Sequence, residues 1–493
     1  MQKIIFIFAL VISGFLFAGC GDFGGINSDP NNPTKPDTRF LYVNAVRVSV
    51  PTFSINDMWN AWTLIFPQYV SEKNNVQFTK FQTLQLSLSN YYSVSIRSLE
   101  EIISLNTNET TKNDPMMVLA FCESNANQIA VARTLRAYIY MHMTDAVGMI
   151  PYSEANKGLA GNFRPKYDTQ QSIYTDLNKE LEEAYSQFDI NNPLDGNYEI
   201  LYGGDIDQWK KFNASVRMQL AIKLFKVDEN KGKTNFAKAF NQGFIRDNAD
   251  ILRYQYLNES SNQNPMYNNI IVAGRRDYWP CATLIDSLVS YHDPRVSAWF
   301  TEKVGGGYAG IPFAAPQSVA TGIKTASLSY WQPYIYAQNA PLVLISPSVM
   351  LLTAAEAAER GWITASAKNL YEEAITASLE QHGVGDEAAA YLAVPKVVYK
   401  TGGTQAQRIA QIAMQKWLAS FMQDGFETWA DWRRLGVPAL NLRDTPKSVA
   451  EIDKLPRRRI YDTGDYDANK DNYNAAISAQ GADVITTRVW WDK

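Results

Sequence analysis

The side chains best suited to acid–base chemistry are three carboxylates near the end of the chain. Asp424, Glu427 and Asp431 stand in the segment FMQDGFETWADWRR. Paired carboxylates separated by about 5–5.5 Å or 6.5–9.5 Å can hydrolyse glycosidic bonds. However, Arg433 and Arg434 follow immediately, and the segment is rich in Phe and Trp. We therefore predict that the cluster forms ion pairs that hold a helix end, rather than a catalytic pair.

Other catalytic patterns have less support. The chain has only three histidines, His142, His292 and His382, and none stands beside a nucleophile-elbow motif. The glycine-rich motifs that bind nucleotide phosphates do not occur. We therefore expect no enzymatic activity and no catalytic residue.

One segment partly matches a metal-binding motif. Residues 465–471 place Asp or Asn at four ligand positions of a calcium loop. The position that requires Gly holds Lys470, and the position that requires the bidentate Glu holds Ala476. A solvated polar turn is expected there and no cofactor is predicted, although a structural calcium ion bound elsewhere by loop carboxylates stays open.

Large aromatic side chains are the stronger chemical signal. The chain has 12 Trp and 27 Tyr, more than a core needs, and flat rings stack on the apolar faces of sugars while polar groups meet the hydroxyls. Asn60 and Arg276 are the polar candidates beside such rings. The aromatic candidates for one surface cleft are Trp59, Trp62, Tyr69, Trp279, Tyr308, Trp331 and Tyr334.

The N-terminus carries the features of a lipoprotein signal peptide. Lys3 precedes an apolar run over residues 4–17, which is too short to span a bilayer but suits a signal peptide. The run ends in Phe17-Ala18-Gly19-Cys20, which resembles a bacterial lipobox. We predict that residues 1–19 are removed and that Cys20 is diacylated, because two acyl chains give a stable anchor.

The residues after Cys20 predict a tether. Gly, Pro, Asn and Asp dominate residues 21–36, a composition typical of turns, so residues 20–37 are expected to hold the body away from the lipid. Cys122 and Cys281 are the other cysteines. They lie far apart in the sequence, and two buried thiols are favoured over a disulfide.

Composition and charge exclude one class of partner. The formal net charge is −4, with 46 basic and 50 acidic residues, and no run of Lys and Arg suggests nucleic-acid binding. The length allows one large domain or two to three smaller ones.

Periodicity predicts helices on both sides of a different central region. Apolar residues recur at three- and four-residue spacings in segments that we expect to be helical, with Pro115 as a first helical residue. Residues 346–360 and 366–382 resemble a tetratricopeptide helix pair. The predicted helical segments are 114–143, 168–188, 207–227, 346–360, 366–382 and 404–423.

The central region, residues 248–345, differs in periodicity and composition. Helical periodicity fades there, and Gly, Pro, Asn and aromatic residues become frequent, as in GGGYAGIPFAAP and SYWQPYIYAQNAP. Long loops carried by a rigid scaffold are commonly functional. We expect one domain over residues 38–493, in which 38–247 and 346–493 form the helical scaffold and 248–345 form the ligand-facing region.

Several segments together resemble one known family. No single segment is diagnostic, but they occur in one order from the N-terminus to the C-terminus, and the chain is similar to the SusD/RagB-like family of outer-membrane lipoproteins. The segments are INSDPNNPT (26–34), TDAVGMIPYSEA (144–155), PKYDTQQSIYTDL (165–177), YGGDIDQWKKFNASVRMQLA (202–221), LISPSVMLLTAAEAAERGWI (344–363), IAMQKWLASFMQDGFETWADWRRLGVPAL (412–440) and TRVWWD (487–492).

The resemblance implies a mostly α-helical protein with four tetratricopeptide-like units, a loop-rich binding half and little strand. It also implies a position on the cell surface, a nutrient ligand and a SusC-like TonB-dependent barrel as partner. The ligand is expected to be a glycan. A peptide, for which Arg275, Arg276 and Asp277 leave room, is the alternative, and a surface glycoside hydrolase is a weaker one.

Overall fold

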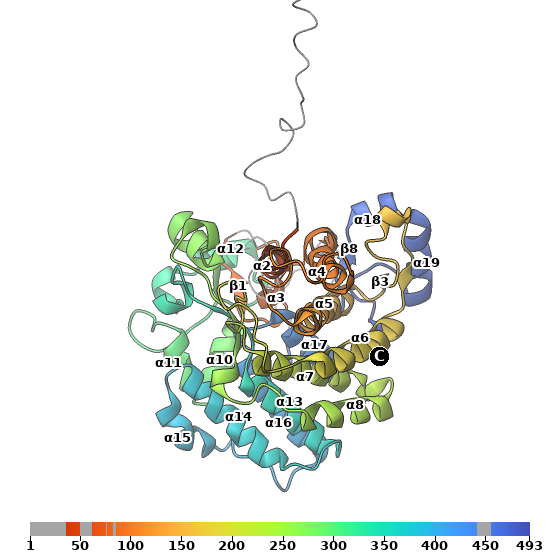
Figure 1. The fold of residues 1–493 in the computed structure, drawn as a ribbon. Helices are drawn as coiled ribbons and strands as arrows, with labels where there is room; N and C mark the ends of the chain where they lie inside the picture. Colours follow the sequence, from red (N-terminus) through yellow and green to blue (C-terminus); the bar gives the residue numbers. More distant parts are fainter. Residues whose placement is uncertain (1–35, 50–61, 75, 82–84, 441–454) are drawn as a thin grey trace, which may run out of the picture.

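The computed structural model describes residues 36–49, 62–74, 76–81, 85–440 and 455–493, and it is mostly helical with only short strands (Figure 1). Helices α13–α16 lie at one end of the molecule, and α2, α4 and α18 lie at the other, where the described chain begins. This confirms the predicted fold class. Cys20, Trp59 and Asn60 lie outside the described residues, and the division into scaffold and ligand-facing regions stays a prediction.

Helices that are neighbours in the sequence pack as pairs, as the tetratricopeptide-like pattern predicts. Helix α5 (Asn125–Val147) packs against α6 (Gln170–Gln187), and α7 (Ile206–Ile222) packs against α8 (Glu229–Asn241). The same arrangement joins α13 (Pro347–Glu359) to α14 (Ala367–Gln381), and α16 (Gln405–Ala419) contacts α17 (Gly425–Leu435).

Side-chain caps explain where these helices begin. The hydroxyls of Ser124, Thr169, Ser346, Ser366 and Thr404 each accept a hydrogen bond from a backbone N–H in the first turn of the helix that follows. Each cap satisfies a donor that has no partner within its own helix. These residues are visible in the sequence, so most helix starts agree closely with the predictions.

One predicted helix begins ten residues too early. The Asp114–Pro115 pair is typical of a helix start, but the chain turns after it, and the Asp114 carboxylate accepts the backbone N–H groups of Met116 and Met117. Helix α5 starts only at Asn125, after the Ser124 cap. The prediction for 114–143 is therefore wrong in its first third, because a short Asx turn uses the same residues as a helix start.

The segment predicted as a helix over 404–423 also ends early. Helix α16 stops at Ala419, and Met422 has a φ of 59° in the left-handed region. That conformation turns the chain sharply, so that Asp424 caps α17 three residues after Phe421. The turn 421–423 becomes part of a cavity described below.

Short elements fill the central region. Strand β5 (Leu252–Tyr254) pairs antiparallel with β7 (Leu342–Ile345), and β1 (Val70–Glu72) pairs with β6 (Tyr278–Pro280). The region is less loop-like than expected, since it contains α9 (Pro265–Tyr267), α10 (Ala282–Ser290), α11 (Arg295–Trp299) and α12 (Gln317–Gly322). These helices are too short for their periodicity to stand out.

The remaining elements complete the body. They are α2 (Thr38–Ser49), α3 (Trp62–Ile65), α4 (Arg97–Thr107), α15 (Ala388–Leu392), α18 (Thr463–Ala468), α19 (Lys470–Gln480), β2 (Gln85–Leu86), β3 (Ile150–Pro151), β4 (Tyr167–Asp168) and β8 (Ile460–Tyr461). In the segment with the calcium-loop pattern, Asp465 and Asp467 belong to α18 and Asp471 belongs to α19, and only Asn469 lies between the two helices, so the segment is mostly helical and not the expected turn.

Helix α5 lies at the centre of the core. Nearly all of its residues from Val131 to Val147 are buried, including the polar side chains of His142 and Asp145. A helix that is buried on all sides must pair its polar groups internally. Cys122 and Cys281 are buried free thiols, as predicted. Within the described ranges no helix is long and apolar enough to cross a membrane.

Candidate functional site

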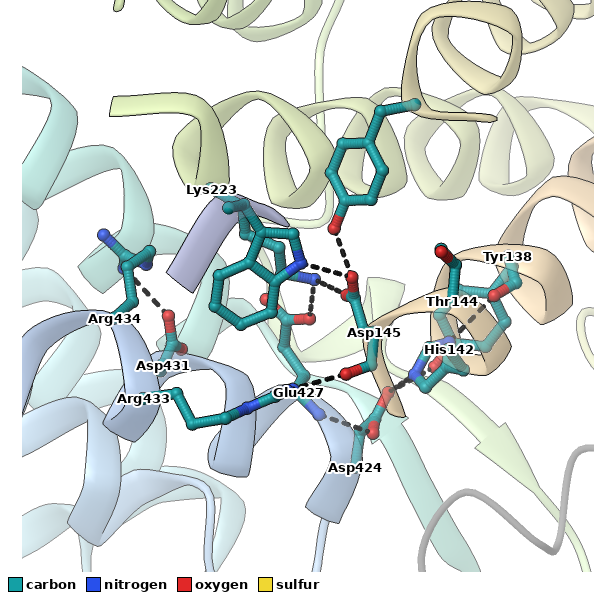
Figure 2. Close-up of polar contacts among 12 residues, drawn as sticks. Tyr138, His142, Thr144, Asp145, Lys223, Asp424, Glu427, Asp431, Arg433 and Arg434 are labelled. Carbon is teal, nitrogen blue, oxygen red and sulfur yellow. Dashed lines mark hydrogen bonds and ion pairs between the residues drawn. The ribbon is translucent and has the colours of Figure 1, made fainter. Parts of the chain in front are cut away.

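The acidic cluster singled out in the sequence lies inside the protein, where α17 meets α5 (Figure 2). Asp424 is the N-cap of α17 and accepts the backbone N–H of Glu427. The same carboxylate lies 2.7 Å from the Tyr138 hydroxyl and 2.6 Å from His142 Nε2. Burial opposes protonation of His142, but the Asp424 charge outweighs it and raises the pKa of the imidazole. This contact joins the two helices.

A buried lysine connects the other acids of the cluster. Lys223 Nζ lies 2.8 Å from Asp145 and 2.5 Å from Glu427, and all three side chains are almost completely buried. Asp145 also accepts hydrogen bonds from the Trp491 indole and the Tyr174 hydroxyl. Burial would lower the pKa of Lys223, but the two carboxylates raise it above its ordinary value, so the lysine stays charged.

Asp431, the last of the three carboxylates, forms ion pairs with two basic side chains. Asp431 lies 2.8 Å from Arg434 and 2.5 Å from Lys416, and Arg434 also forms a two-pronged pair with the buried Glu356. Burial alone would raise the pKa of Asp431, but these cations lower it. The prediction of structural ion pairs is thus confirmed. The hollow beside Asp431 has room for about 10 Å³ only, which is too small for a sugar ring.

A cavity of about 330 Å³ offers a better place for a ligand. Its wall combines the end of α14, the turn 421–423, and the two segments that flank the β5–β7 pair. Ligand pockets of small molecules begin near this size, at about 300 Å³. The lining is mostly apolar and includes Ile251, Tyr256, Trp299, Tyr334, Leu342 and Phe421.

Aromatic packing holds the wall in place. The Trp299 ring lies edge-on to His382 with centroids 5.0 Å apart, and it lies 4.6 Å from Phe421. Trp299 is 1% exposed, whereas Tyr334 at the rim is 52% exposed. Ring pairs of this geometry contribute about 0.5–1.5 kcal/mol each. The inner wall is therefore preformed, and Tyr334 is free to meet a ligand.

Polar atoms without partners gather around this cavity. Such atoms are uncommon inside proteins and call for an explanation, for example a ligand that hydrogen-bonds to them. Six lining residues each carry one buried side-chain atom with no hydrogen-bond partner among the described residues. These atoms are Asn248 Oδ1, Tyr256 OH, Trp299 Nε1, Gln381 Oε1, His382 Nε2 and Gln423 Oε1.

The histidine in the cavity wall is uncharged. Burial and the nearby Arg295 lower the pKa of His382 to about 3, so the ring is neutral near neutral pH. Arg295 itself is paired with Asp293, with Nη2 and Oδ2 2.5 Å apart. A neutral imidazole can donate from one nitrogen and accept at the other. The lining holds one basic and one acidic residue, Arg253 and Glu380, so the site is suited to a ligand without net charge that has both apolar faces and hydroxyl or amide groups.

The turn that closes the cavity is conformationally unusual. Met422 adopts a left-handed conformation between Phe421 and Gln423, two lining residues. A non-glycine residue with this φ costs energy and often marks a functional site. Because Asp424 follows directly, the ion-pair network fixes one end of this turn.

Four of the aromatic residues predicted to form a surface cleft are packing residues. Trp62, Tyr69, Trp279 and Trp331 are exposed by no more than 6%. Trp62 packs edge-on against Phe426, and the Tyr69 hydroxyl donates to the carbonyl of Trp417. The idea that all seven rings line one cleft is therefore wrong for these four, since strand pairing and ring packing bury them.

The other predicted site residues have different surroundings. Tyr334 lines the cavity, whereas Tyr308 is half-buried and Arg276 is exposed, with its guanidinium 5.3 Å from the centre of the Tyr330 ring. Neither Tyr308 nor Arg276 lines the cavity. Their part in binding stays a prediction, as does that of Trp59 and Asn60 outside the described residues.

The residues of the inner wall of the cavity were not among the predicted site residues. Trp299, His382 and Phe421 come from three segments that are far apart in the chain, and each has a plausible packing role by itself. Only the aromatic density of residues 248–345 pointed toward Trp299. For His382 the single local signal is its place at the end of α14, before Gly383.

Comparison with known proteins agrees with the fold. The SusD-like family model described as "Starch-binding associating with outer membrane" matches residues 30–462. No curated protein matches the chain significantly. A chitin-binding protein of known structure is similar over 93% of this chain and 100% of its own, with 25% identity and a TM-score of 0.76.

Two further structures show the same fold. A SusD homologue from Bacteroides uniformis has 23% identity and a TM-score of 0.78, and it covers 92% of this chain and 99% of its own. A chitin-binding SusD homologue from Flavobacterium johnsoniae has 21% identity and a TM-score of 0.73, with coverages of 92% and 98%. With a family match over most of its length, this chain belongs to the SusD-like family of starch-binding proteins that associate with the outer membrane.

Proposed function

We propose that this protein is a cell-surface lipoprotein that binds an oligosaccharide in the cavity at Trp299, Tyr334 and His382 and delivers it to a transporter. The observation that carries the proposal is the cavity itself, which has aromatic walls, a neutral histidine and six buried polar atoms without partners among the described residues. Sugars present apolar C–H faces beside many hydroxyls, so they match both halves of that lining.

A glycan fits this cavity better than a peptide does. A peptide site would offer pockets for charged side chains or an edge strand for backbone pairing. Here one basic and one acidic residue line the cavity, Arg253 and Glu380. Arg295 near His382 is already paired with Asp293, and His382 is neutral. Arg275 and Asp277 are two of the residues that suggested a peptide ligand, and they are hydrogen-bonded to each other, with Arg275 Nε 2.8 Å from the Asp277 carboxylate. The chitin-binding relative supports the same class of ligand.

The first prediction tests ligand class by calorimetric titration of the soluble form, residues 21–493. Neutral oligomers of N-acetylglucosamine or glucose should bind, and charged peptides of similar length should not. Affinity should change less than about twofold between pH 6 and pH 8, because His382, with a pKa of about 3, does not titrate there. Binding of peptides alone would contradict the proposal.

We infer further that the protein is anchored through Cys20 and works with a TonB-dependent barrel of the SusC type. The lipobox-like end of the leader supports the anchor, and the family's association with the outer membrane supports the location. No helix in the described part of the chain could span a membrane. A binding protein of this kind needs a separate pore to move its ligand inward.

The second prediction concerns this membrane complex. Cys20→Ala should remove fatty-acid labelling and release the protein from the membrane fraction, because both acyl chains are attached to that thiol. Mild detergent extraction of the unmodified protein should recover a barrel in near-equal amounts. Label that persists on the variant would contradict the anchor, and recovery of the lipoprotein alone in several mild detergents would contradict the partner.

A further inference from the structure

The loop between β3 and β4, residues 152–166, carries the two most exposed large apolar side chains among the described residues. Leu159 is 99% exposed and Phe163 is 79% exposed. Single apolar side chains on a surface are common and need no partner. Two that are almost fully exposed on one loop are a different case, since removing both from water at one contact would be favourable.

The loop has a defined shape although it lies on the surface. The Glu154 carboxylate accepts the backbone N–H of Lys166 over 3.0 Å and the Asn162 amide over 3.1 Å, which closes the loop across its base. Gly161, with a φ of 84°, turns the chain between the two apolar residues. Glycine adopts this left-handed conformation without strain. The apolar side chains are therefore presented by a fixed backbone.

Hydrogen bonds also fix the loop to the body of the protein. Asn156 donates to the carbonyl of Tyr92 over 3.2 Å. Asn469, at the end of α18, donates to the carbonyl of Pro165 over 2.6 Å. The loop thus lies beside α18, at the end of the molecule where α2 and the described chain begin (Figure 1).

The charge of the loop is positive. Its basic residues are Lys157, Arg164 and Lys166, and Glu154 is its one acidic residue. Lys166 lies 3.6 Å from Asp168, just after the loop. Lys157 donates to a backbone carbonyl, and neither Lys157 nor Arg164 forms an ion pair with a described residue. Apolar side chains beside free cations are typical of surfaces that lie in a lipid headgroup layer.

The proposed lipid anchor gives this loop a partner. Cys20 precedes Pro36, the first described residue, by sixteen positions, and a chain of that length reaches about 50–60 Å at most. The anchor alone therefore leaves the body free to turn above the bilayer. A second contact at the end where the described chain begins would fix which face of the body points away from the membrane.

We propose that loop 152–166 is a second membrane contact, in which Leu159 and Phe163 enter the headgroup layer while Lys157 and Arg164 face the anionic phosphates of the lipid. This inference rests on the proposed lipid anchor and adds an orientation of the body on the membrane. Two apolar side chains and two cations bind a membrane weakly by themselves. The anchor makes their contact intramolecular, so a weak contact is enough to hold one orientation.

The test replaces the acyl chains with a chemical tether, so its outcome does not depend on acylation. The soluble form, residues 21–493, is attached by an N-terminal histidine tag to vesicles of phosphatidylethanolamine, phosphatidylglycerol and a nickel-chelating lipid. Leu159→Cys carries a polarity-sensitive fluorophore, which brominated lipids quench on contact. Val398→Cys, 48% exposed between α15 and α16 at the opposite end, is the matched control. Both other cysteines of the soluble form are buried, so the fluorophore labels the introduced thiol.

We expect the fluorophore at Leu159 to be quenched several-fold more strongly than the one at Val398, with its emission shifted to shorter wavelength on the vesicles. Phe163→Gln combined with Lys157→Gln and Arg164→Gln should lower the contact equilibrium of the labelled loop at least about tenfold. These three side chains are exposed, so thermal unfolding should stay unchanged. Vesicles of neutral phosphatidylcholine should give weaker quenching, because they do not attract the two cations.

Equal quenching at the two labelled positions, or quenching that persists in the triple variant, would overturn the membrane contact. Protection of the fluorophore that requires added barrel protein would assign the loop to the barrel and would overturn the membrane contact too. Both results leave oligosaccharide binding and the anchor as proposed. Absence of fatty-acid label on Cys20 would instead overturn the anchor, whatever the loop does in this assay.

Discussion

Lys223→Met should destabilise the protein by about 3–5 kcal/mol, as expected when one member of a buried ion-pair network is removed. Lys223 is fully buried between Asp145 and Glu427, at 2.8 and 2.5 Å. Methionine has a similar shape but no charge, so it leaves two carboxylates in the interior without their cation. Burial already raises the pKa of Glu427 against the pull of Lys223, and without the lysine this carboxyl should become protonated.

The measurement is the free energy of unfolding in denaturant, compared with a matched surface control. Lys238→Met removes the same charge from an ion pair with Glu182, where both side chains are more than a third exposed. Exposed pairs contribute about 0–1 kcal/mol, so the control should be almost as stable as the unmodified protein. Equal losses of unfolding free energy in the two variants would show that the buried network stabilises the protein no more than an exposed ion pair does.

The difference between the variants should also depend on pH. A carboxylate that loses its cation has a higher pKa in the folded state, so the Lys223→Met protein should regain part of its stability as the pH falls and the acid becomes neutral. In the unmodified protein Lys223 lowers the pKa of Glu427, so this recovery should be smaller there. No recovery at lower pH would indicate that lost packing, and not an unpaired charge, caused the destabilisation.

Trp279→Ala and Tyr334→Ala should separate packing from binding, although the sequence presents both rings as ligand contacts. Trp279 is 4% exposed, packs edge-on against Tyr330 and donates to the carbonyl of Arg276. Its removal should cost about 3–5 kcal/mol of stability, the range for buried Trp or Phe truncated to Ala. Tyr334 lines the cavity and is 52% exposed, so its removal should cost little stability.

Binding should show the opposite pattern. Loss of Tyr334 should weaken oligosaccharide affinity about tenfold, equivalent to about 1.4 kcal/mol, because a ring that stacks on the sugar is removed. Trp279→Ala, assayed well below its melting temperature, should retain affinity within about threefold, since Trp279 does not line the cavity. Calorimetric titration and thermal unfolding of both variants measure the two effects. If Tyr334→Ala lost stability but kept its affinity, Tyr334 would not be a ligand contact.

The local features of the fold could be read from the sequence. The predicted segments 346–360, 366–382 and 404–423 begin at Ser346, Ser366 and Thr404, and these residues cap the helices in the structure, because a cap depends only on residues within one turn. The ion pairs around Asp431 were also foreseen, since Arg434 lies three residues away on the same helix. At Asp114 the same local logic failed, because an Asx turn and a helix cap begin with the same residue type.

Only the tertiary structure decided which aromatic residues are available to a ligand. Trp279 is buried because its strand pairs with residues 70–72, about two hundred residues earlier in the chain, and Trp331 is buried because its ring stacks on Phe421. The cavity likewise joins Trp299, Tyr334, His382 and Gln423 from separate segments. Composition could indicate that rings would be exposed, but burial is a property of contacts between distant parts of the chain. The sequence by itself therefore determined the helices, their caps and the family, whereas long-range packing determined the binding surface.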